Sequence, residues 1–239
     1  VLHIQNGGEN LEDKVVTIRG WTSGSSNGAL VKTMNGQGSF GRSWIKVDGL
    51  VDILADVTDG SGAGEAISAV ASTIEVGGGK IFATNDGTGE TNFGGGNSFA
   101  IRSYGEFVSK NWGIVNVNVT KESEAADAKA TGAGNLTTQI SGDFSTVGGM
   151  GTQGIINVGL NTEDSYWYGD YSAGSGFGVT PGDYDVLNLW MGNGAEWKGY
   201  TAYATNLVMD SGATWYGYSH NNENLIMSLK NEAMWTPTT

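Results

Sequence analysis

The fold is decided by Leu189-x-Met191-x-x-Gly194-Ala195-x-Trp197, the first of three copies of one phrase near the end of the chain. The other copies are Leu207-x-Met209-x-x-Gly212-Ala213-x-Trp215 and Met227-x-Leu229-x-x-Glu232-Ala233-x-Trp235. The three tryptophans are 18 and then 20 residues apart, and a fainter copy runs from Val158 to Trp167. Repeats of about 20 residues are typical of solenoids, in which successive turns of chain stack and share one core.

Within the phrase, apolar residues alternate as they do in short strands. Leu189 and Met191 are two residues apart, so in an extended chain they point to the same side. The break at Gly192-Asn193-Gly194 tolerates the positive φ that a sharp corner requires. Ala195 and Trp197 then form a second inward pair. The pattern predicts polygonal turns of two or three short strands, stacked about 4.8 Å apart.

Composition supports strands and corners and excludes several classes of protein. The 239 residues include 40 glycines, which suits frequent corners, but only 2 prolines, which excludes collagen. The net charge is −13 and the 12 basic residues form no cluster, so we expect no nucleic-acid partner, and an anionic membrane surface is disfavoured. No apolar run approaches 18 residues, so we expect no direct membrane insertion. Cysteine is absent, so stability must come from the stacked core and the backbone hydrogen bonds.

Upstream of the repeats, short β-branched strands alternate with glycine corners. The predicted strands are residues 14–19, 43–47, 50–54, 67–76, 80–84 and 114–119, with a turn at Asp48-Gly49 and a corner at Gly77-Gly78-Gly79. Asparagine alternates with valine over 114–119, which favours side-chain ladders between turns. We expect loop excursions near residues 85–98, 121–134 and 169–185. The Ala-, Glu- and Lys-rich stretch from Lys121 to Ala130 is compatible with a short helix or with a solvated loop.

The repeated phrase resembles the late passenger-domain repeats of bacterial autotransporters, and the resemblance is clearest over residues 155–235. These passengers are right-handed parallel β-helices on Gram-negative cell surfaces. The resemblance implies an all-β fold, a right-handed parallel β-helix (solenoid) with glycine-rich loop excursions. It also implies that residues 1–239 are a single β-helix passenger fragment, truncated at both ends, because the chain opens at Val1 without a leader and stops in mid-pattern.

The resemblance specifies architecture better than activity. It implies a secreted adhesin, displayed at the cell surface from a Gram-negative outer membrane, that attaches to a host or bacterial surface protein or glycan. Self-association is a further mode of binding. Two alternatives remain open: a carbohydrate-active, pectinase-like β-helix enzyme, and a structural stalk that binds nothing.

Catalytic residues of the familiar kinds do not form a complete set. A serine triad needs a general-base histidine, and the chain has only His3, at its start, and His220, in a polar turn. The string Gly24-Ser25-Ser26-Asn27-Gly28 matches a nucleophile elbow but lacks the strand–turn–helix setting. We therefore expect a binding protein rather than an enzyme and predict no catalytic residue.

Metal-binding patterns are equally incomplete. Asp48, Asp52 and Asp56 form a row of carboxylates, but four residues of strand span about 13 Å, too far to share one ion. The acidic turns at 56–60 and 85–87 do not match an EF-hand loop or a calcium-binding nonapeptide repeat. With no cysteine and two distant histidines, a zinc site is excluded. We predict no metal and no cofactor.

The aromatic residues are the strongest functional signal. Four tryptophans occupy one phase of the repeat, which predicts a buried stack: Trp167, Trp197, Trp215 and Trp235. Five tyrosines lie beside them and are candidate ligand contacts: Tyr168, Tyr200, Tyr203, Tyr216 and Tyr218. If they face solvent, their rings can stack on sugars and their hydroxyls can hydrogen-bond. The alternative is that they are ordinary residues of amphipathic strands.

Overall fold

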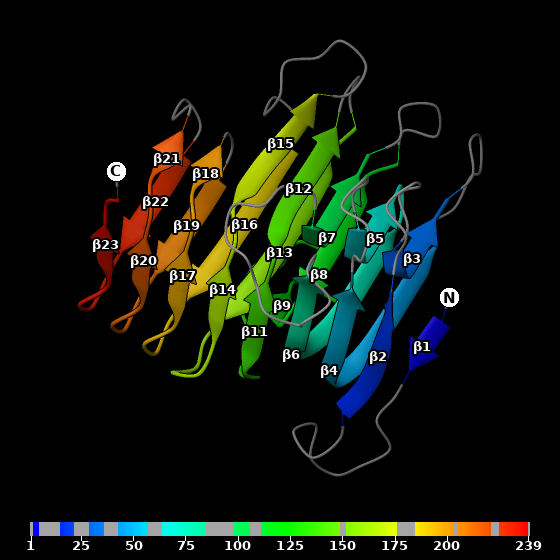
Figure 1. Ribbon diagram of the computed structural model, residues 1–239, viewed down its shortest axis with the longest axis horizontal. Helices are drawn as coiled ribbons and strands as arrows, with labels where there is room; N and C mark the ends of the chain where they lie inside the picture. Colours follow the sequence, from blue (N-terminus) through cyan, green and yellow to red (C-terminus); the bar gives the residue numbers. More distant parts are fainter. Residues whose placement is uncertain are drawn as a thin grey trace.

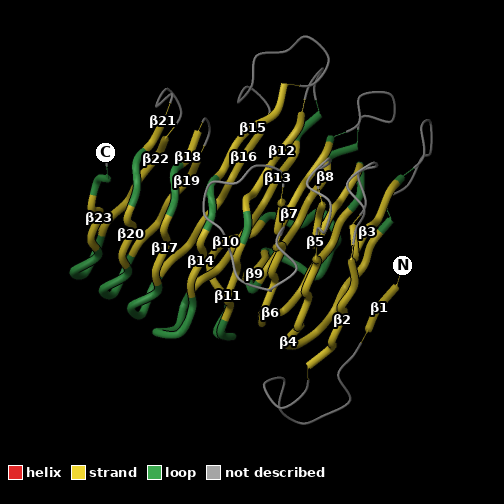
Figure 2. The backbone as a smooth tube through the Cα atoms, in the orientation of Figure 1, coloured by secondary structure: helices red, strands yellow, loops and turns green. Residues whose placement is uncertain are grey.

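The computed structural model of the chain describes residues 2–4, 15–21, 29–35, 43–56, 64–84, 98–105, 111–148, 152–175, 185–202, 205–220 and 225–238. Within these ranges all regular structure is β-strand (Figure 2), and nearly all neighbouring strands are parallel. This part of the chain contains no helix, and so none that is long and apolar enough to cross a membrane. The prediction of an all-β protein built from parallel strands is confirmed.

A first row of parallel strands, called face 1 here, crosses the whole molecule (Figure 1). Its strands are, in spatial order, β1 (Leu2–Ile4), the first half of β4 (Trp44–Asp56), the first half of β6 (Thr73–Thr84), β8 (Gly113–Val117), β13 (Gly154–Leu160), β16 (Asp185–Met191), β19 (Thr205–Met209) and β22 (Leu225–Leu229). The order follows the sequence, but other strands always intervene between neighbours.

A second row, face 2, belongs to the same 14-stranded sheet because β4 and β6 are long enough to continue from one face to the other. Its strands are β2 (Val15–Trp21), the second halves of β4 and β6, β11 (Thr138–Ser141), β14 (Tyr166–Tyr168), β17 (Glu196–Lys198), β20 (Thr214–Tyr216) and β23 (Met234–Thr236).

A separate 7-stranded parallel sheet forms face 3. Its strands are β3 (Ala29–Met34), β5 (Gly64–Val70), β7 (Ser98–Tyr104), β12 (Asp143–Gly148), β15 (Tyr171–Ser175), β18 (Thr201–Ala202) and β21 (Ser219–His220). From β12 onward the chain visits face 3, face 1 and face 2 in a fixed cycle.

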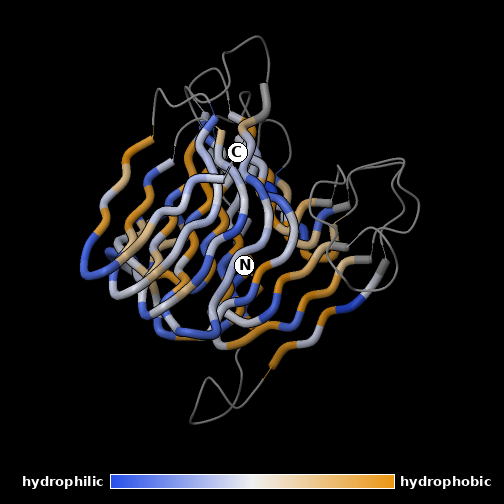
Figure 3. Tube along the Cα trace, turned by 60° about the vertical axis from the view of Figure 1, so that its left-hand side comes forward, coloured by the Kyte–Doolittle hydropathy of each residue, from blue (hydrophilic) through white to orange (hydrophobic). Residues whose placement is uncertain are grey.

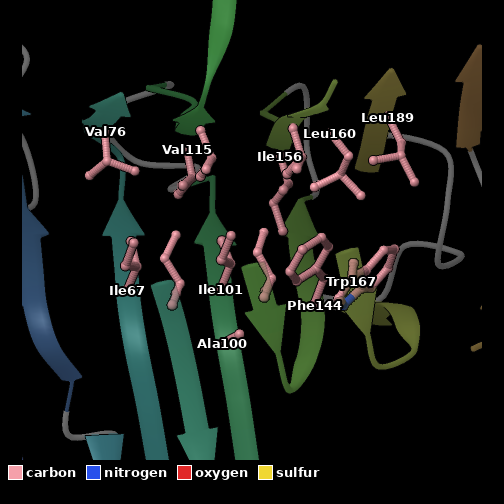
Figure 4. Packing of buried hydrophobic residues seen from close by; sticks show 14 of the residues in the cluster. Ile67, Val76, Ala100, Ile101, Val115, Phe144, Ile156, Leu160, Trp167 and Leu189 are labelled. Carbon is pink, nitrogen blue, oxygen red and sulfur yellow. The ribbon is translucent and has the colours of Figure 1, made fainter. Parts of the chain in front are cut away.

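One hydrophobic cluster receives side chains from all three faces. In Figure 4, Val115, Ile156 and Leu189 of face 1 lie opposite Ile101 and Phe144 of face 3. Along the strands, hydrophobic and hydrophilic residues alternate (Figure 3), so that one side of each strand enters the cluster and the other faces outward. Burial of this shared cluster holds the faces together.

The predicted tryptophan stack is confirmed. Trp167, Trp197 and Trp215 are fully buried, and their ring centroids are 4.6 Å apart at each step. Trp235 continues the stack at 5.2 Å and is partly exposed. At the other end Phe144 lies 3.9 Å from Trp167, so the stack begins with a residue that the repeated phrase did not reveal.

The length of the repeat varies along the chain. Register partners on face 1 are 18 residues apart between Asn188 and Asn206, but 31 apart between Asn157 and Asn188 and 41 apart between Asn116 and Asn157. The repeat of about 20 residues is therefore correct only near the C-terminal end. Nearer the N-terminus, both the strands of face 3 and the connections between strands are longer.

Two predicted strand breaks are wrong. β4 runs through Asp48-Gly49, and β6 runs through Gly77-Gly78-Gly79. The register of β4 against β6 shifts between Val47 and Leu50, so an irregularity bends the paired strands from face 1 to face 2 without ending them.

The predicted excursions have different outcomes. Residues 121–134 lie mainly in an antiparallel hairpin of β9 (Val119–Lys121) and β10 (Ala130–Ala133), joined by bends and a turn, so the stretch is a loop and not a short helix. The excursion expected at 169–185 was placed too early, because β15 continues face 3 through Ser175; residues 176–184 lie outside the described part. Residues 85–97 also lie outside it.

Candidate ligand-binding surface

Strands β14, β17 and β20 of face 2 each place one tryptophan inward and the two flanking side chains outward. The triplets are Tyr166-Trp167-Tyr168 in β14, Glu196-Trp197-Lys198 in β17 and Thr214-Trp215-Tyr216 in β20. Their register is exact, tryptophan against tryptophan, because neighbouring strands are parallel and unshifted. The outward residues therefore form two straight rows across three successive turns.

Five of these outward side chains form a connected surface, which we call the tyrosine patch. Its members are Tyr166, Tyr168, Glu196, Lys198 and Tyr216. The Tyr166 and Tyr168 rings stack with centroids 4.4 Å apart. The Nζ of Lys198 lies 4.9 Å from the Tyr168 centroid and 5.7 Å from the Tyr216 centroid, between the two rings.

Glu196 connects the patch through hydrogen bonds. Its Oε1 accepts a hydrogen bond from the Tyr168 hydroxyl at 2.6 Å and lies 2.7 Å from the Nζ of Lys198. Burial raises the pKa of Glu196, but the hydrogen bonds from Lys198 and Tyr168 outweigh burial and lower the pKa overall. The hydrogen bond to Glu196 raises the pKa of Lys198. Both groups are therefore charged at neutral pH, and the patch combines aromatic rings with charged hydrogen-bonding groups.

A second group of outward residues, the corner row, lies where face 2 turns into face 3. Its members are Asp143, Asp170, Tyr200 and Tyr218, each directly after a glycine at the same corner of a successive turn. Asp143 Oδ1 accepts a hydrogen bond from the Asp170 backbone N–H at 3.0 Å, and Asp170 Oδ1 accepts one from the Tyr200 N–H at 2.9 Å. Each carboxylate thus caps the backbone of the next turn.

The two carboxyl groups of the corner row have perturbed acidity. Burial, together with the negative charge of Asp143, raises the pKa of Asp170 to about 6, although the hydrogen bond from Tyr200 opposes this. Burial also raises the pKa of Asp143. Next in the row, the Tyr200 and Tyr218 rings stack at 5.4 Å.

The five predicted tyrosine contacts are divided between these two groups. Tyr168 and Tyr216 belong to the tyrosine patch, and Tyr200 and Tyr218 belong to the corner row. Tyr218 is 42% exposed, whereas the other three are half-buried, so each has both solvent-facing and strand-packing character. Tyr203 lies outside the described residues.

The residues that sequence reasoning missed are Tyr166, Glu196 and Lys198 of the patch, and Asp143 and Asp170 of the corner row. Aligning the repeats on their tryptophans and reading the positions on either side would have found the patch, because those positions share one face. The same alignment would have found Asp170, which lies three residues after Trp167, but Asp143 follows no tryptophan and carries no such signal.

The histidines and the acidic row lie elsewhere. His3 Nε2 is 2.6 Å from Asp48 Oδ2 on face 1. On face 3, the rings of His220 and Tyr218 form a T-shaped pair with centroids 6.4 Å apart. Asp52 pairs with Arg19, and the Asp56 side chain is not described. In the described ranges no three His, Cys, Asp or Glu side chains converge as metal ligands would.

Comparison of the chain with protein-family models, with curated proteins and with solved structures finds no match. Hypotheses about its function therefore depend on the geometry of the two outward groups and on the sequence resemblance.

Proposed function

We propose that the three faces are the sides of a right-handed parallel β-helix of the kind found in autotransporter passengers. The cyclic order of strands, the register of the tryptophans and the shared hydrophobic cluster support stacked turns. The right-handed sense comes from the resemblance and agrees with the general preference of parallel β crossovers.

We further propose that this β-helix is an adhesion module displayed at the cell surface of a Gram-negative bacterium, where it attaches to a glycan on a host or bacterial surface. The observation that carries the proposal is the tyrosine patch. Stacked tyrosine rings offer flat apolar surfaces to the C–H faces of sugar rings, while Glu196 and Lys198 offer an acceptor and a donor to hydroxyl groups. A protein ligand or a second copy of the chain would also find aromatic anchors there.

Rigidity also favours binding by this surface. The patch residues are side chains of parallel strands whose tryptophans are buried in one stack, so their positions are set before a ligand arrives. Preorganised side chains lose little conformational entropy on binding. A stalk with no ligand has no need for such an arrangement on its outer face.

The corner row supports a second candidate, a carbohydrate-active enzyme. Two carboxyl groups from successive turns, one with a pKa of about 6, resemble the acid and base of a glycosidase. The hydrogen bonds that Asp143 and Asp170 accept from backbone N–H groups give both a structural use, so we rank this candidate below adhesion.

Binding to a glycan array and to whole cells tests the adhesion proposal. Tyr168→Ala and Tyr216→Ala should each weaken binding several-fold, because each removes about 0.5–1.5 kcal/mol of aromatic contact. Thr214→Ala, a change on the same strand next to the patch, is the control and should bind as the unaltered protein does. Equal binding by all four proteins would rule out the patch as the binding surface, and no binding by any would favour the stalk.

Analysis of released sugars distinguishes the enzyme hypothesis from the adhesion hypothesis. Release of reducing or unsaturated sugars from polysaccharide, abolished by Asp170→Asn, would replace adhesion as the function. Adhesion predicts no release by either protein.

A further inference from the structure

A cavity of about 550 Å³ lies on the outer side of the 14-stranded sheet, remote in sequence from the tyrosine patch. Its charged lining residues are Lys46 and Asp48 from β4, Glu75 from β6, and Lys121 and Glu124 from the β9–β10 hairpin and its loop. Its uncharged polar lining residues are Asn116, Asn118 and Thr120. This volume is typical of pockets that hold small molecules. The hairpin is the only antiparallel element among the described strands, and it forms one wall of the cavity.

The cavity exists because the sheet lacks side chains at its bend. Gly49 and Gly77 line it where β4 and β6 turn from face 1 to face 2. A Cβ on Gly77 would lie 2.4 Å from the carbonyl oxygen of Gly49, so the two strands can approach only without one. Val119 and Leu136 add apolar wall on the hairpin side. The cavity therefore combines backbone and apolar wall with charged side chains.

Charges in the cavity are unequal. Two lysines face three carboxylates, which leaves a surplus of one negative charge when His3, which lies 2.6 Å from Asp48 Oδ2, is counted as neutral. Lys46 Nζ lies 2.8 Å from Glu124 Oε2 and 3.5 Å from Asp48 Oδ1, so its charge is already compensated. The net charge of −13 on the whole chain adds an attraction for cations.

The surroundings of Glu75 indicate what kind of ligand the cavity would bind. Its residue is 6% exposed, and its Oε1 accepts hydrogen bonds from Lys121 Nζ at 2.5 Å and from Asn116 Nδ2 at 3.2 Å. Its Oε2 accepts no hydrogen bond from any residue that the structure describes. Glu75 lines the cavity, so a bound ammonium group would donate a charge-assisted hydrogen bond to this oxygen.

From these observations we propose that the cavity binds a small molecule that carries a primary ammonium group beside hydroxyl groups, as a free hexosamine does. The ammonium group donates to Glu75 Oε2, and the hydroxyl groups bond to Lys46 and Asp48, which also line the cavity. The site is independent of the tyrosine patch and does not depend on the proposed adhesion function.

NMR titration of the whole chain with D-glucosamine, N-acetyl-D-glucosamine and D-glucose tests the proposal. D-Glucosamine should shift the backbone amide signals of residues 75, 116 and 121. The other two sugars, which have the same ring size without the ammonium group, should bind at least about tenfold more weakly, because a hydrogen bond to a charged group is lost. Equal binding of D-glucose and D-glucosamine would contradict the role of the ammonium group.

Variants locate the site. Glu75→Gln keeps the Oε1 acceptor, removes the charge and should weaken D-glucosamine binding at least about tenfold. Glu122→Gln makes the same chemical change on the exposed part of the hairpin loop, outside the cavity lining, and should bind normally. Leu136→Phe places a larger side chain in the wall of the cavity and should also abolish D-glucosamine binding. This variant tests the site independently if Glu75→Gln does not fold. The proposal would be overturned if the unaltered chain does not bind D-glucosamine, or if Leu136→Phe binds it as tightly as the unaltered chain does. Tyr168→Ala, a change in the tyrosine patch, should leave D-glucosamine binding unchanged.

Discussion

Neighbouring segments of the chain approach each other closely at the glycine two residues after each buried tryptophan. Trp215 Nε1 donates a hydrogen bond to the carbonyl oxygen of Gly199 at 2.9 Å, and Trp197 Nε1 donates to Gly169 at 3.1 Å. A Cβ on Gly199 would lie 1.9 Å from the carbonyl oxygen of Gly169. The glycine therefore allows both the stacking of the corners and the indole hydrogen bond, and any side chain would push the turns apart.

Gly199→Ala should lower the free energy of unfolding by about 1–3 kcal/mol, the usual cost of overpacking, as measured by urea denaturation. Gly132→Ala, in the hairpin, is the control: its nearest neighbour would be a threonine side-chain oxygen at 3.3 Å, which can move. An unchanged midpoint for Gly199→Ala would show that the turns are not in contact at this corner.

Asp170 gives the stability a pH dependence. Its folded pKa of about 6 lies above the ordinary 3.8, chiefly because of burial, so the folded state binds more protons than the unfolded state between these values. This contribution is fully present below the unfolded pKa and is lost as the pH rises through about 6. Comparison of urea midpoints at about pH 7.5 and about pH 5 should show a smaller gain on acidification in Asp170→Asn than in the unaltered protein. An identical gain in both would mean that Asp170 titrates normally.

Neighbouring strands of face 1 are joined by an asparagine ladder as well as by their backbones. Asn206 donates to Asn188, Asn188 to Asn157, Asn157 to Asn116, and Asn116 to Glu75, with distances of 2.7–3.2 Å. The alternation of asparagine and valine in the sequence predicted such a ladder, and the structure confirms it. The ladder links five strands and ends on the carboxylate that lines the cavity.

Asn157→Ala should cost about 1–3 kcal/mol, because it leaves an Asn188 donor and an Asn116 acceptor unpaired where Asn116 and Asn157 are buried. Asn206→Ala, at the half-exposed end of the ladder, should cost less because water can replace the lost donor. Thermal unfolding of the two variants measures the difference. Equal losses would contradict a ladder whose inner members are sealed from water.

The sequence predicted strands correctly where hydrophobic and polar side chains alternate. It did not predict whether a strand continues or ends where the conformation of glycine residues determines the outcome. The tryptophan phase of the repeats correctly predicted which residues of β14, β17 and β20 enter the core. The glycines of β4 and β6 predict breaks that the structure does not contain, because glycine allows both a turn and a bend and only pairing with a neighbouring strand selects between them. The acidic pair of the corner row depends on contacts between residues 27 apart, which no local pattern records.

In the whole molecule, the three faces depend on one another through the shared cluster. Phe144 and Tyr171 of face 3, Trp167 of face 2 and Ile156 of face 1 are all fully buried in it. A single face could not by itself shield these residues from water. The three faces should therefore unfold together. The outward groups gain fixed positions from this arrangement, and both proposed binding sites require it.

Stacking in register is tested most directly by pyrene labels, because the chain has no cysteine of its own. Val208 and Ser228 are register partners on the outer side of face 1, whereas Ser172 lies on the outer side of face 3. Stacked turns predict excimer emission from dilute protein labelled at Val208→Cys and Ser228→Cys, and monomer emission from protein labelled at Val208→Cys and Ser172→Cys. Monomer emission from the first pair in the folded protein would contradict the stacking of successive turns.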